Sequence, residues 1–280
     1  RLNLYKNWNS NIWSKREMRL AFIGYGNMSS ALIGGISSSK KFNPSDEIYI
    51  FHNKKNSDFN LEKCKFLESG TEVSDSFDII FLCVKPKDIE IAINENINIF
   101  QDDQTVISVA AGVTVGTIKK LLGNNSSVIR AMPNLCAVYN ESITGICMED
   151  ELSSERKGIV EEIFRGIGHV RKIDENEMHD FTALFGSGPA YLIYFYEALL
   201  DCGKFKNISN EDKSMLLIHL LNSTSKMLFV TKDVKKLRHS ISSKGGTTEA
   251  AIQLLEDKNF KEIIVEALEV AMKRSKDISK

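Results

Sequence analysis

The sequence predicts an α/β protein in which a doubly wound parallel sheet fills the N-terminal half and helices alone form the C-terminal half. Short runs rich in β-branched and aromatic residues recur through the first half, with helix-compatible segments between them. Strands that alternate with helices indicate a parallel sheet covered on both faces. From about Asp174 onward the strand signal disappears and apolar residues recur at intervals of three and four, the period of an amphipathic helix.

The expected elements follow one another along the first half. Helix-compatible segments at Ser29–Ile36 and Thr114–Leu122 supply crossovers of the kind that parallel strands need. An acidic segment after Ile173 precedes the first long helical pattern, so we expect an extension over 1–17, a sheet domain over 18–173 and a helical domain over 174–280. The expected strands cover Leu20–Ile23, Ile48–Phe51, Ile79–Val84, Thr105–Val109, Val128–Ala131, Ile143–Met148 and His169–Ile173.

The composition argues against several classes of function. The 280 residues carry a formal net charge of -1 with lysines and acids interspersed, so bulk charge does not recruit nucleic acid. The five cysteines show no paired spacing and the five histidines form no HExxH motif, so we expect no metal and a reducing, cytoplasmic compartment. Cys83 lies inside an apolar run and is expected to be a core residue. No apolar run reaches the ~18 to 20 residues of a membrane span.

A glycine turn follows the first expected strand. It reads Gly24-Tyr25-Gly26-Asn27-Met28-Ser29, a GxGxxG pattern with serine at its last position. Serine is small enough to keep the helix close to the strand, and the strand before and helix after are the right context for a dinucleotide pyrophosphate. The pattern therefore predicts a Rossmann domain, with a structural glycine turn as the alternative.

In Rossmann domains, the residues at the end of the second strand contact the adenosine ribose of the cofactor and distinguish a free 2′-hydroxyl from a 2′-phosphate. In this chain, the segment is His52-Asn53-Lys54-Lys55 and holds no carboxylate. Contacts from Lys54 and its neighbours to a 2′-phosphate favour NADPH. The alternative is a pair of solvated surface lysines and the use of both NADPH and NADH.

A second glycine loop lies near the C-terminus, at Ser240–Ala250, and opens a helical pattern with Gly245-Gly246-Thr247-Thr248. Backbone N–H groups, hydroxyls and the positive end of a helix dipole form a seat for a small carboxylate. The alternative is a helix cap in which the threonines bond their own first amides. A site for a hydride-carrying cofactor and a site for a substrate carboxylate in one chain suggest a reductase.

The helical half contains a segment that is apolar around much of its circumference, at Met215–Leu221 and Met227–Val230. A domain of about 100 residues has too few neighbours to cover such a helix on every side, so a second chain is the expected cover. We interpret this segment as a dimer interface. Burial within the chain is the alternative.

Six motifs in this order, IGYGNM, VKP, SVAAGVT, RAMPN, FGSGPAY and SSKGGTTEA, resemble pyrroline-5-carboxylate reductase over about Met18–Ser279. The resemblance implies NAD(P)H-dependent reduction of the cyclic imine 1-pyrroline-5-carboxylate to L-proline, the last step of proline biosynthesis. It also implies an N-terminal Rossmann domain and an all-α dimerisation domain, with dimers often assembled into larger rings.

The resemblance also implies site residues. It places the substrate at Glu175, Thr182, Gly245, Gly246, Thr247 and Thr248. It places the cofactor at Gly24, Tyr25, Gly26, Asn27, Met28, Asn53, Val84, Lys85, Pro86, Ala110, Ala111 and Ser240. Two positions depart from the family pattern: Lys244 replaces a proline in the glycine loop, and Phe185 replaces a small residue before the GSG motif.

The chemistry of a cyclic imine explains which groups the chain lacks. A protonated imine accepts hydride without a metal, so the protein needs chiefly to orient the two reactants and exclude water. Thr182 is the candidate to bond the ring nitrogen and assist its protonation, with water as the alternative proton source. A β-hydroxyacid dehydrogenase would require a lysine, or a histidine with a carboxylate, to move the alcohol proton, and the segment after Phe185 has no lysine. A non-catalytic dinucleotide-binding sensor is the alternative from another class.

Overall fold

The structure is a computed structural model that describes residues 17–38, 46–53, 64–74, 76–203, 205–231 and 233–278. The predicted N-terminal extension, apart from Glu17, and the predicted cofactor residue Lys54 lie outside these ranges. The chain divides into two compact units. The first contains the described residues up to Ser187 together with those from Ala271 onward, and the second is Gly188–Val270.

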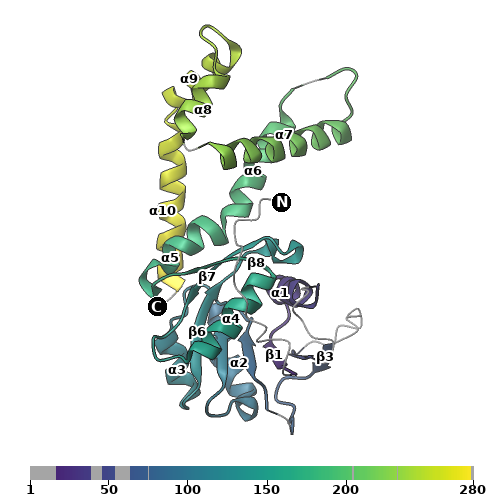
Figure 1. The fold of residues 1–280 in the computed structure, drawn as a ribbon, viewed down its shortest axis with the longest axis vertical. Coiled ribbons are helices and arrows are strands. Elements are labelled where there is room, and N and C mark those ends of the chain that lie inside the picture. Colours follow the sequence, from purple (N-terminus) through teal and green to yellow (C-terminus); the bar gives the residue numbers. More distant parts are fainter. Residues whose placement is uncertain are drawn as a thin grey trace. The chain divides into compact units, whose positions relative to one another are not determined.

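The first unit is built on an eight-stranded sheet of order β3-β2-β1-β4-β5-β6-β7-β8 (Figure 1). All neighbouring strands pair in parallel except β6 and β7, which are antiparallel. The strands are β1 (Arg19–Ile23), β2 (Glu47–Phe51), β3 (Cys64–Leu67), β4 (Ile79–Leu82), β5 (Thr105–Ser108), β6 (Ser127–Met132), β7 (Ser142–Cys147) and β8 (Gly168–Lys172). The predicted α/β class is confirmed.

Two features of the sheet differ from the sequence prediction. Strand β3 was not predicted, because this edge strand is half exposed and lacks the apolar run that marks the central strands. Strand β7 runs against its neighbour because only residues 133–141, which include the turn η4 (Leu135–Tyr139), connect it to β6. A parallel crossover needs a dozen residues or more, so this short connection forces an antiparallel pair.

Alternating side chains of the strands build two cores, one on each face of the sheet. In β1, Leu20 and Phe22 belong to one core, whereas Ala21 and Ile23 belong to the other. This separation follows from the two-residue period of a strand. Helices α1 (Asn27–Ser38) and α4 (Ser154–Gly166) cover the first face, and α2 (Ile89–Glu95) and α3 (Val115–Leu122) cover the second. Both faces are therefore buried, as the continuous apolar strands predicted.

Helical turns follow the sheet in the first unit. The turn η5 (Glu175–Glu177) leads into α5 (Met178–Phe181) and then into a π-helical turn, η6 (Thr182–Gly186). The C-terminal residues of α10 (Phe260–Ile278) also belong to this unit, where the Nδ1 of His179 lies 3.0 Å from the Oγ of Ser275. A π-turn inside a helix is rare and is frequently found at functional sites.

The second unit is entirely helical in its described part. It contains α6 (Gly188–Asp201), α7 (Asn210–Val230), α8 (Val234–Ile241), α9 (Thr247–Asp257) and the N-terminal part of α10. Helices α6 and α7 contact each other through the hydroxyl of Tyr196, which lies 2.6 Å from that of Ser214. None of the described helices is both long enough and apolar enough to cross a bilayer.

Candidate functional site

The glycine turn after β1 has the geometry of a dinucleotide seat. Gly24 has φ +92°, and a Cβ atom there would lie 2.6 Å from the Cγ1 of Val84, so a side chain is excluded by both conformation and space. A Cβ atom on Gly26 would meet no heavy atom within 4 Å, so this side of the turn is open. The first N–H groups of α1 follow at Asn27 and Met28 and have no partner within the helix. The turn therefore fits a pyrophosphate group.

The serine in place of the third glycine closes this turn. The Oγ of Ser29 accepts a hydrogen bond of 2.7 Å from the N–H of Gly26 and lies 3.0 Å from its carbonyl oxygen, to which it donates. Ser29 is fully buried, so the small side chain also lets α1 approach the sheet. The departure from the glycine pattern thus adds a local bond to the turn.

Predicted cofactor residues from three neighbouring strands meet at the carboxyl edge of the sheet. Val84, Lys85 and Pro86 follow β4, beside the glycine turn, and Ala110 and Ala111 follow β5. The chain order reverses between β1 and β4, and ligands of doubly wound sheets bind at such a switch point. The structure therefore brings Gly24–Met28 together with both later segments.

Asn53 lies two residues beyond the end of β2. In Rossmann domains, this position contacts the adenosine ribose of the cofactor. The Nδ2 of Asn53 donates a hydrogen bond of 3.1 Å to the Oε2 of Glu95, the last residue of α2. This carboxylate was not foreseen, because 42 residues separate the two side chains in the sequence. The side chains of Asn53 and Glu95 are exposed at this point.

A buried guanidinium lies beneath the predicted substrate residue Glu175. The Oε1 of Glu175 accepts a hydrogen bond of 2.9 Å from the N–H of Val115, in the first turn of α3, and lies 3.4 Å from the Nη1 of Arg130. Burial lowers the pKa of Arg130, and the charge of Glu175 opposes that shift. Arginine still remains protonated. The Nη2 of Arg130 is buried without a hydrogen-bond partner within the described residues.

Thr182 begins the π-turn and is 8% exposed. Its Oγ1 donates a hydrogen bond of 2.6 Å to the carbonyl oxygen of Met178, so the hydroxyl hydrogen is in use and the oxygen lone pairs remain as acceptors. The turn is held further by the N–H of Ser187, which bonds the carbonyl of Thr182 at 2.9 Å. Thr182 is therefore oriented to accept a hydrogen bond rather than to donate one.

The RAMPN and FGSG motifs contact each other next to this turn. The Nδ2 of Asn134 donates to the carbonyl oxygen of Phe185 at 3.0 Å. The ring of Phe185 packs on that of Phe181 with centroids 4.8 Å apart, and a Cβ atom on Gly186 would lie 2.7 Å from the Cε of Met132. Phe185, which replaces a small residue of the family pattern, thus adds an aromatic contact with Phe181. Gly186, the next residue, packs closely against Met132.

The second glycine loop lies in the helical unit and begins α9. Gly245 has φ +73°, and Gly246 caps the helix with no side-chain bond. The N–H of Gly245 donates to the Oε2 of Glu249 at 2.7 Å, so this amide is already satisfied within the loop. The amides and hydroxyls of Thr247 and Thr248 follow at the helix N-terminus. The groups that remain to bind a small anion are therefore the amides and hydroxyls of the two threonines, and not the amide of Gly245.

The predicted cofactor residue Ser240 also lies in the helical unit, in α8. Its Oγ donates a hydrogen bond of 2.7 Å to the carbonyl oxygen of Leu237, one turn earlier. The side chain therefore bonds its own helix and retains only acceptor capacity. A cofactor contact through this residue would have to use those lone pairs.

The cysteines fit structural roles. Burial raises the pKa of the Cys83 thiol far above its usual range and that of Cys64 to about 11. A thiol with a raised pKa is a poor nucleophile. In the described part of the chain, no group of three or more His, Cys, Asp or Glu side chains is placed to hold a metal ion.

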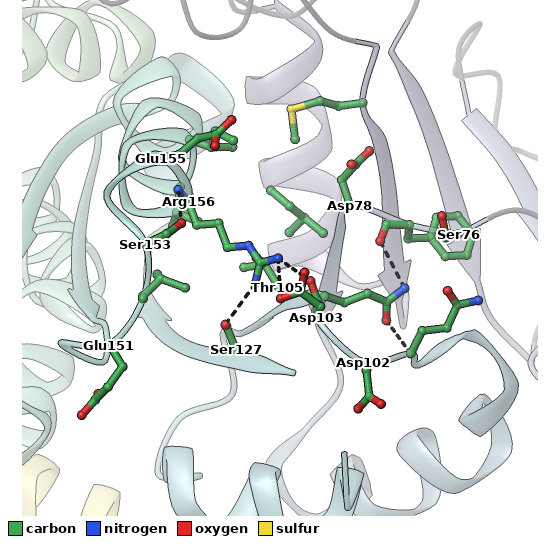
Figure 2. Close-up of a pocket in the computed structure, with 18 residues that line it drawn as sticks. Ser76, Asp78, Asp102, Asp103, Thr105, Ser127, Glu151, Ser153, Glu155 and Arg156 are labelled. Atoms are coloured by element: carbon green, nitrogen blue, oxygen red, sulfur yellow. Dashed lines mark hydrogen bonds and ion pairs between the residues drawn. The ribbon is translucent and has the colours of Figure 1, made fainter. Parts of the chain in front are cut away.

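A cavity of about 690 Å³ opens at the opposite, amino-terminal edge of the sheet (Figure 2). Its Arg156 already bonds the carbonyl oxygen of Asp103 at 2.6 Å, the Oδ1 of Asp103 at 2.8 Å and the Oγ of Ser127 at 3.4 Å. Ligands of doubly wound sheets bind at the carboxyl edge, so size alone does not make this cavity the functional site.

Helix α7 exposes the apolar face that the sequence assigned to an interface. None of its side chains is buried, and Leu216 and Leu220 are 57% and 56% exposed. Within the described residues, the chain itself does not cover this helix, contrary to the alternative of intrachain burial. Apolar residues exposed on this scale mark a protein interface.

Comparison with known proteins gives consistent matches over most of the chain. A family model described as pyrroline-5-carboxylate reductase dimerisation matches residues 175–278, and one described as NADP oxidoreductase coenzyme F420-dependent matches residues 19–112. Pyrroline-5-carboxylate reductase 2 of Bacillus subtilis (strain 168) is 34% identical over 93% of this chain and 95% of its own. The Escherichia coli (strain K12) pyrroline-5-carboxylate reductase is 31% identical over 94% and 99%.

Solved structures give the same result. The Plasmodium falciparum pyrroline carboxylate reductase with NADP bound has a TM-score of 0.84 and 26% identity, over 94% of this chain and 98% of that one. The Coxiella burnetii pyrroline-5-carboxylate reductase has a TM-score of 0.76 and 30% identity, over 95% and 100%.

Proposed function

The chain belongs to the pyrroline-5-carboxylate reductase family, and we propose that it reduces the cyclic imine 1-pyrroline-5-carboxylate to L-proline with NADPH, or NADH, as the reductant. The observation that carries the cofactor half is the glycine turn at the switch point, with Gly24 in a conformation closed to side chains and Gly26 open. Bound at this edge, the reduced nicotinamide would supply a hydride. The activity is the last step of proline biosynthesis.

The protein's part in the reaction is chiefly to bind and orient the substrate. The hydroxyls and amides of Thr247 and Thr248 hold the substrate carboxylate at the N-terminus of α9. This binding fixes the ring and leaves the imine carbon as the electrophile. No strong acid is required, because a cyclic imine takes its proton from water.

Thr182 acts as a hydrogen-bond acceptor. Its own hydrogen is donated to Met178, so its lone pairs bond the N–H of the protonated imine and stabilise the positive charge that makes the carbon reactive. Reduction of that carbon would move the C=N π electrons to nitrogen and give the amine of proline. Thr182 thus contacts the ring nitrogen, as the sequence suggested, but as an acceptor, and water is the proton source.

In the first unit, Arg130 and Val115 hold the side chain of Glu175 for a substrate contact. One oxygen of Glu175 is held by Val115 and Arg130, and its other oxygen, Oε2, is the one that bonds the substrate. The buried guanidinium of Arg130 orients the carboxylate through this contact. Glu175 is therefore both a substrate contact and a link between α3 and the turn η5.

The alternatives receive less support. A β-hydroxyacid dehydrogenase would need a lysine, or a histidine with a carboxylate, to move the alcohol proton, and α6 contains neither lysine nor histidine. A silent dinucleotide-binding sensor would not need the threonine pair at α9. We further propose a homodimer formed through the apolar face of α7, larger assemblies built from such dimers, and a cytoplasmic location.

The test is turnover by the purified protein. Addition of 1-pyrroline-5-carboxylate to enzyme and NADPH is expected to consume the absorbance of the reduced cofactor and to release one proline per cofactor oxidised. A folded sample, saturated with cofactor, that forms no proline would overturn the proposal.

A further inference from the structure

The adenosine end of the cofactor site contains a carboxylate that comes from outside β2. Rossmann domains discriminate between cofactors at the end of the second strand, where an acidic residue accepts from a free ribose hydroxyl and a cation accommodates a 2′-phosphate. In this chain the residue at that position is Asn53, and its amide donates to the Oε2 of Glu95 at 3.1 Å. The acidic group missing from the strand is thus supplied by the end of α2.

The backbone that carries Glu95 is fixed by its neighbour. Asn96 is fully buried, and its Nδ2 donates to the carbonyl oxygen of Ala92 at 2.8 Å. Its Oδ1 accepts from the N–H of Gly70 at 3.0 Å, which ties α2 to the segment after β3. Gly70 has φ +83°, and a Cβ atom there would lie 3.1 Å from the carbonyl oxygen of Glu95. These contacts hold the carboxylate beside Asn53.

We propose that Glu95 is a cofactor-specificity residue, which lowers the affinity for the 2′-phosphate of NADPH and favours the free 2′-hydroxyl of NADH. A 2′-phosphate carries about -1.5 to -2 charges at neutral pH. The carboxylate of Glu95, which accepts a hydrogen bond from Asn53, repels such a group. A free hydroxyl can instead donate to that carboxylate. The inference rests on the proposed function, because it assumes that a dinucleotide binds at this edge.

The test measures the binding of two adenosine probes rather than turnover. Calorimetric titration of the full chain with 2′,5′-ADP and with 5′-ADP reports the affinity for the phosphorylated and unphosphorylated ribose separately. Glu95→Gln removes the charge and keeps an oxygen that accepts from Asn53. Glu90→Gln is the matched control, since it removes the same charge from the first turn of α2 and is also exposed.

Glu95→Gln is expected to tighten 2′,5′-ADP binding by at least about fivefold, because two unit charges about 4 Å apart in water give about this effect and the phosphate carries more than one charge. Binding of 5′-ADP is expected to stay within about twofold or to weaken, because the carboxylate acceptor is lost. Glu90→Gln is expected to leave the ratio of the two affinities unchanged. The gain for 2′,5′-ADP should also shrink as salt is raised, since salt screens exposed charges.

An unchanged affinity ratio in Glu95→Gln, or an equal change in Glu90→Gln, would overturn the specificity role while leaving the proposed function intact. Failure of both probes to bind the folded wild-type chain would overturn the inference together with the cofactor half of the proposed function. A shifted ratio in a protein that forms no proline would support the role of Glu95 and reject the reductase activity alone.

Discussion

At the scale of single residues, the direction of one hydrogen bond decides the role of Thr182. The resemblance marked this residue as a substrate contact, and the sequence made it a candidate to assist protonation of the ring nitrogen, with water as the alternative proton source. The bond from its Oγ1 to the carbonyl of Met178 uses the only hydrogen of the hydroxyl. A residue that has already donated its hydrogen acts on a charged N–H group as an acceptor.

The substitution Thr182→Val tests this role. Valine keeps the branched shape and removes the lone pairs, so kcat is expected to fall about 10- to 100-fold, the worth of a hydrogen bond to a charged group. Thr182→Ser keeps the oxygen and is the control, with kcat expected to remain within a few fold. Steady-state rates with saturating NADPH measure both. Full activity in the valine variant would contradict the assignment.

The side chain of Glu175 is held by residues that are distant in the sequence. Its contacts with Val115 and Arg130 span 60 and 45 residues of sequence. Arg130 was visible only as part of a motif, and nothing in its residue type predicted a buried guanidinium with an unpartnered Nη2. Long-range pairs of this kind arise from the order of the strands, which the pattern of one segment does not contain.

Among the secondary structure elements, the N-terminus of α9 is the proposed seat of the substrate carboxylate. The threonine pair lies at this helix end, and Glu249 already occupies the amide of Gly245. The dinucleotide turn lies in the other unit, at the end of β1. The two ligands are therefore expected to depend on different elements.

The substitution Thr248→Ala tests this division of labour. Loss of one hydroxyl is expected to raise KM for the imine about 10-fold, which corresponds to roughly 1.4 kcal/mol. Binding of NADPH, measured by titration without substrate, is expected to change little. Equal losses for both ligands would show that the loop serves both sites.

The contact between α5 and α10 makes stability sensitive to pH. Burial, followed by the charges of Arg130 and Lys276, lowers the pKa of His179 below the ordinary 6.5. A depressed histidine pKa means that the unfolded state binds the proton more readily, so this stabilisation is present above pH 6.5 and is lost as pH falls through the lower folded pKa.

The free energy of unfolding is accordingly expected to decrease more steeply below about pH 6.5 in the wild type than in His179→Asn, which cannot titrate in this range. Denaturant unfolding at a series of pH values measures the difference. His169→Asn is the control, because that exposed side chain lies in β8, away from the contact with Ser275. Parallel pH curves for the wild type and His179→Asn would rule out this role for His179.

At the scale of the whole molecule, the helical unit is incomplete as a single chain. Its described helices α6 to α9 contain no buried residues, although α7 is rich in leucine, isoleucine and methionine. Isolated apolar side chains are common on protein surfaces, but a helix that is exposed throughout requires a partner. The match to a dimerisation model over residues 175–278 supports a second copy of this chain as that partner.

The double substitution Leu216→Asp and Leu220→Asp tests this partner. The two leucines lie four residues apart on one face of α7, so two carboxylates there would have to be buried in the dimer. Sedimentation equilibrium is expected to show dimers or larger species for the wild type and a shift toward monomer for the variant. Asn222→Asp adds a charge to the same helix and serves as the control. An unchanged mass in the double variant would place the interface elsewhere.

The sequence predicted most of the sheet because buried strands and glycine turns are local signals. It missed β3, whose half-exposed residues have no apolar run, and it could not show that the nine residues 133–141 force β7 to run antiparallel. It identified Asn53 and Glu175 but not Glu95 or Arg130 as their partners. Each omission concerns a neighbour that lies far away along the chain.

The fold class, the dinucleotide turn and the membership of a reductase family could be predicted from the amino-acid sequence, because periodicity and ordered motifs are properties of short segments. The pairs of groups that bond one another became known with the folded structure: the hydroxyl of Thr182 with Met178, the carboxylate of Glu175 with Arg130, and the amide of Asn53 with Glu95. Hydrogen bonds and charges act over a few ångströms in space, so their partners depend on how distant segments pack.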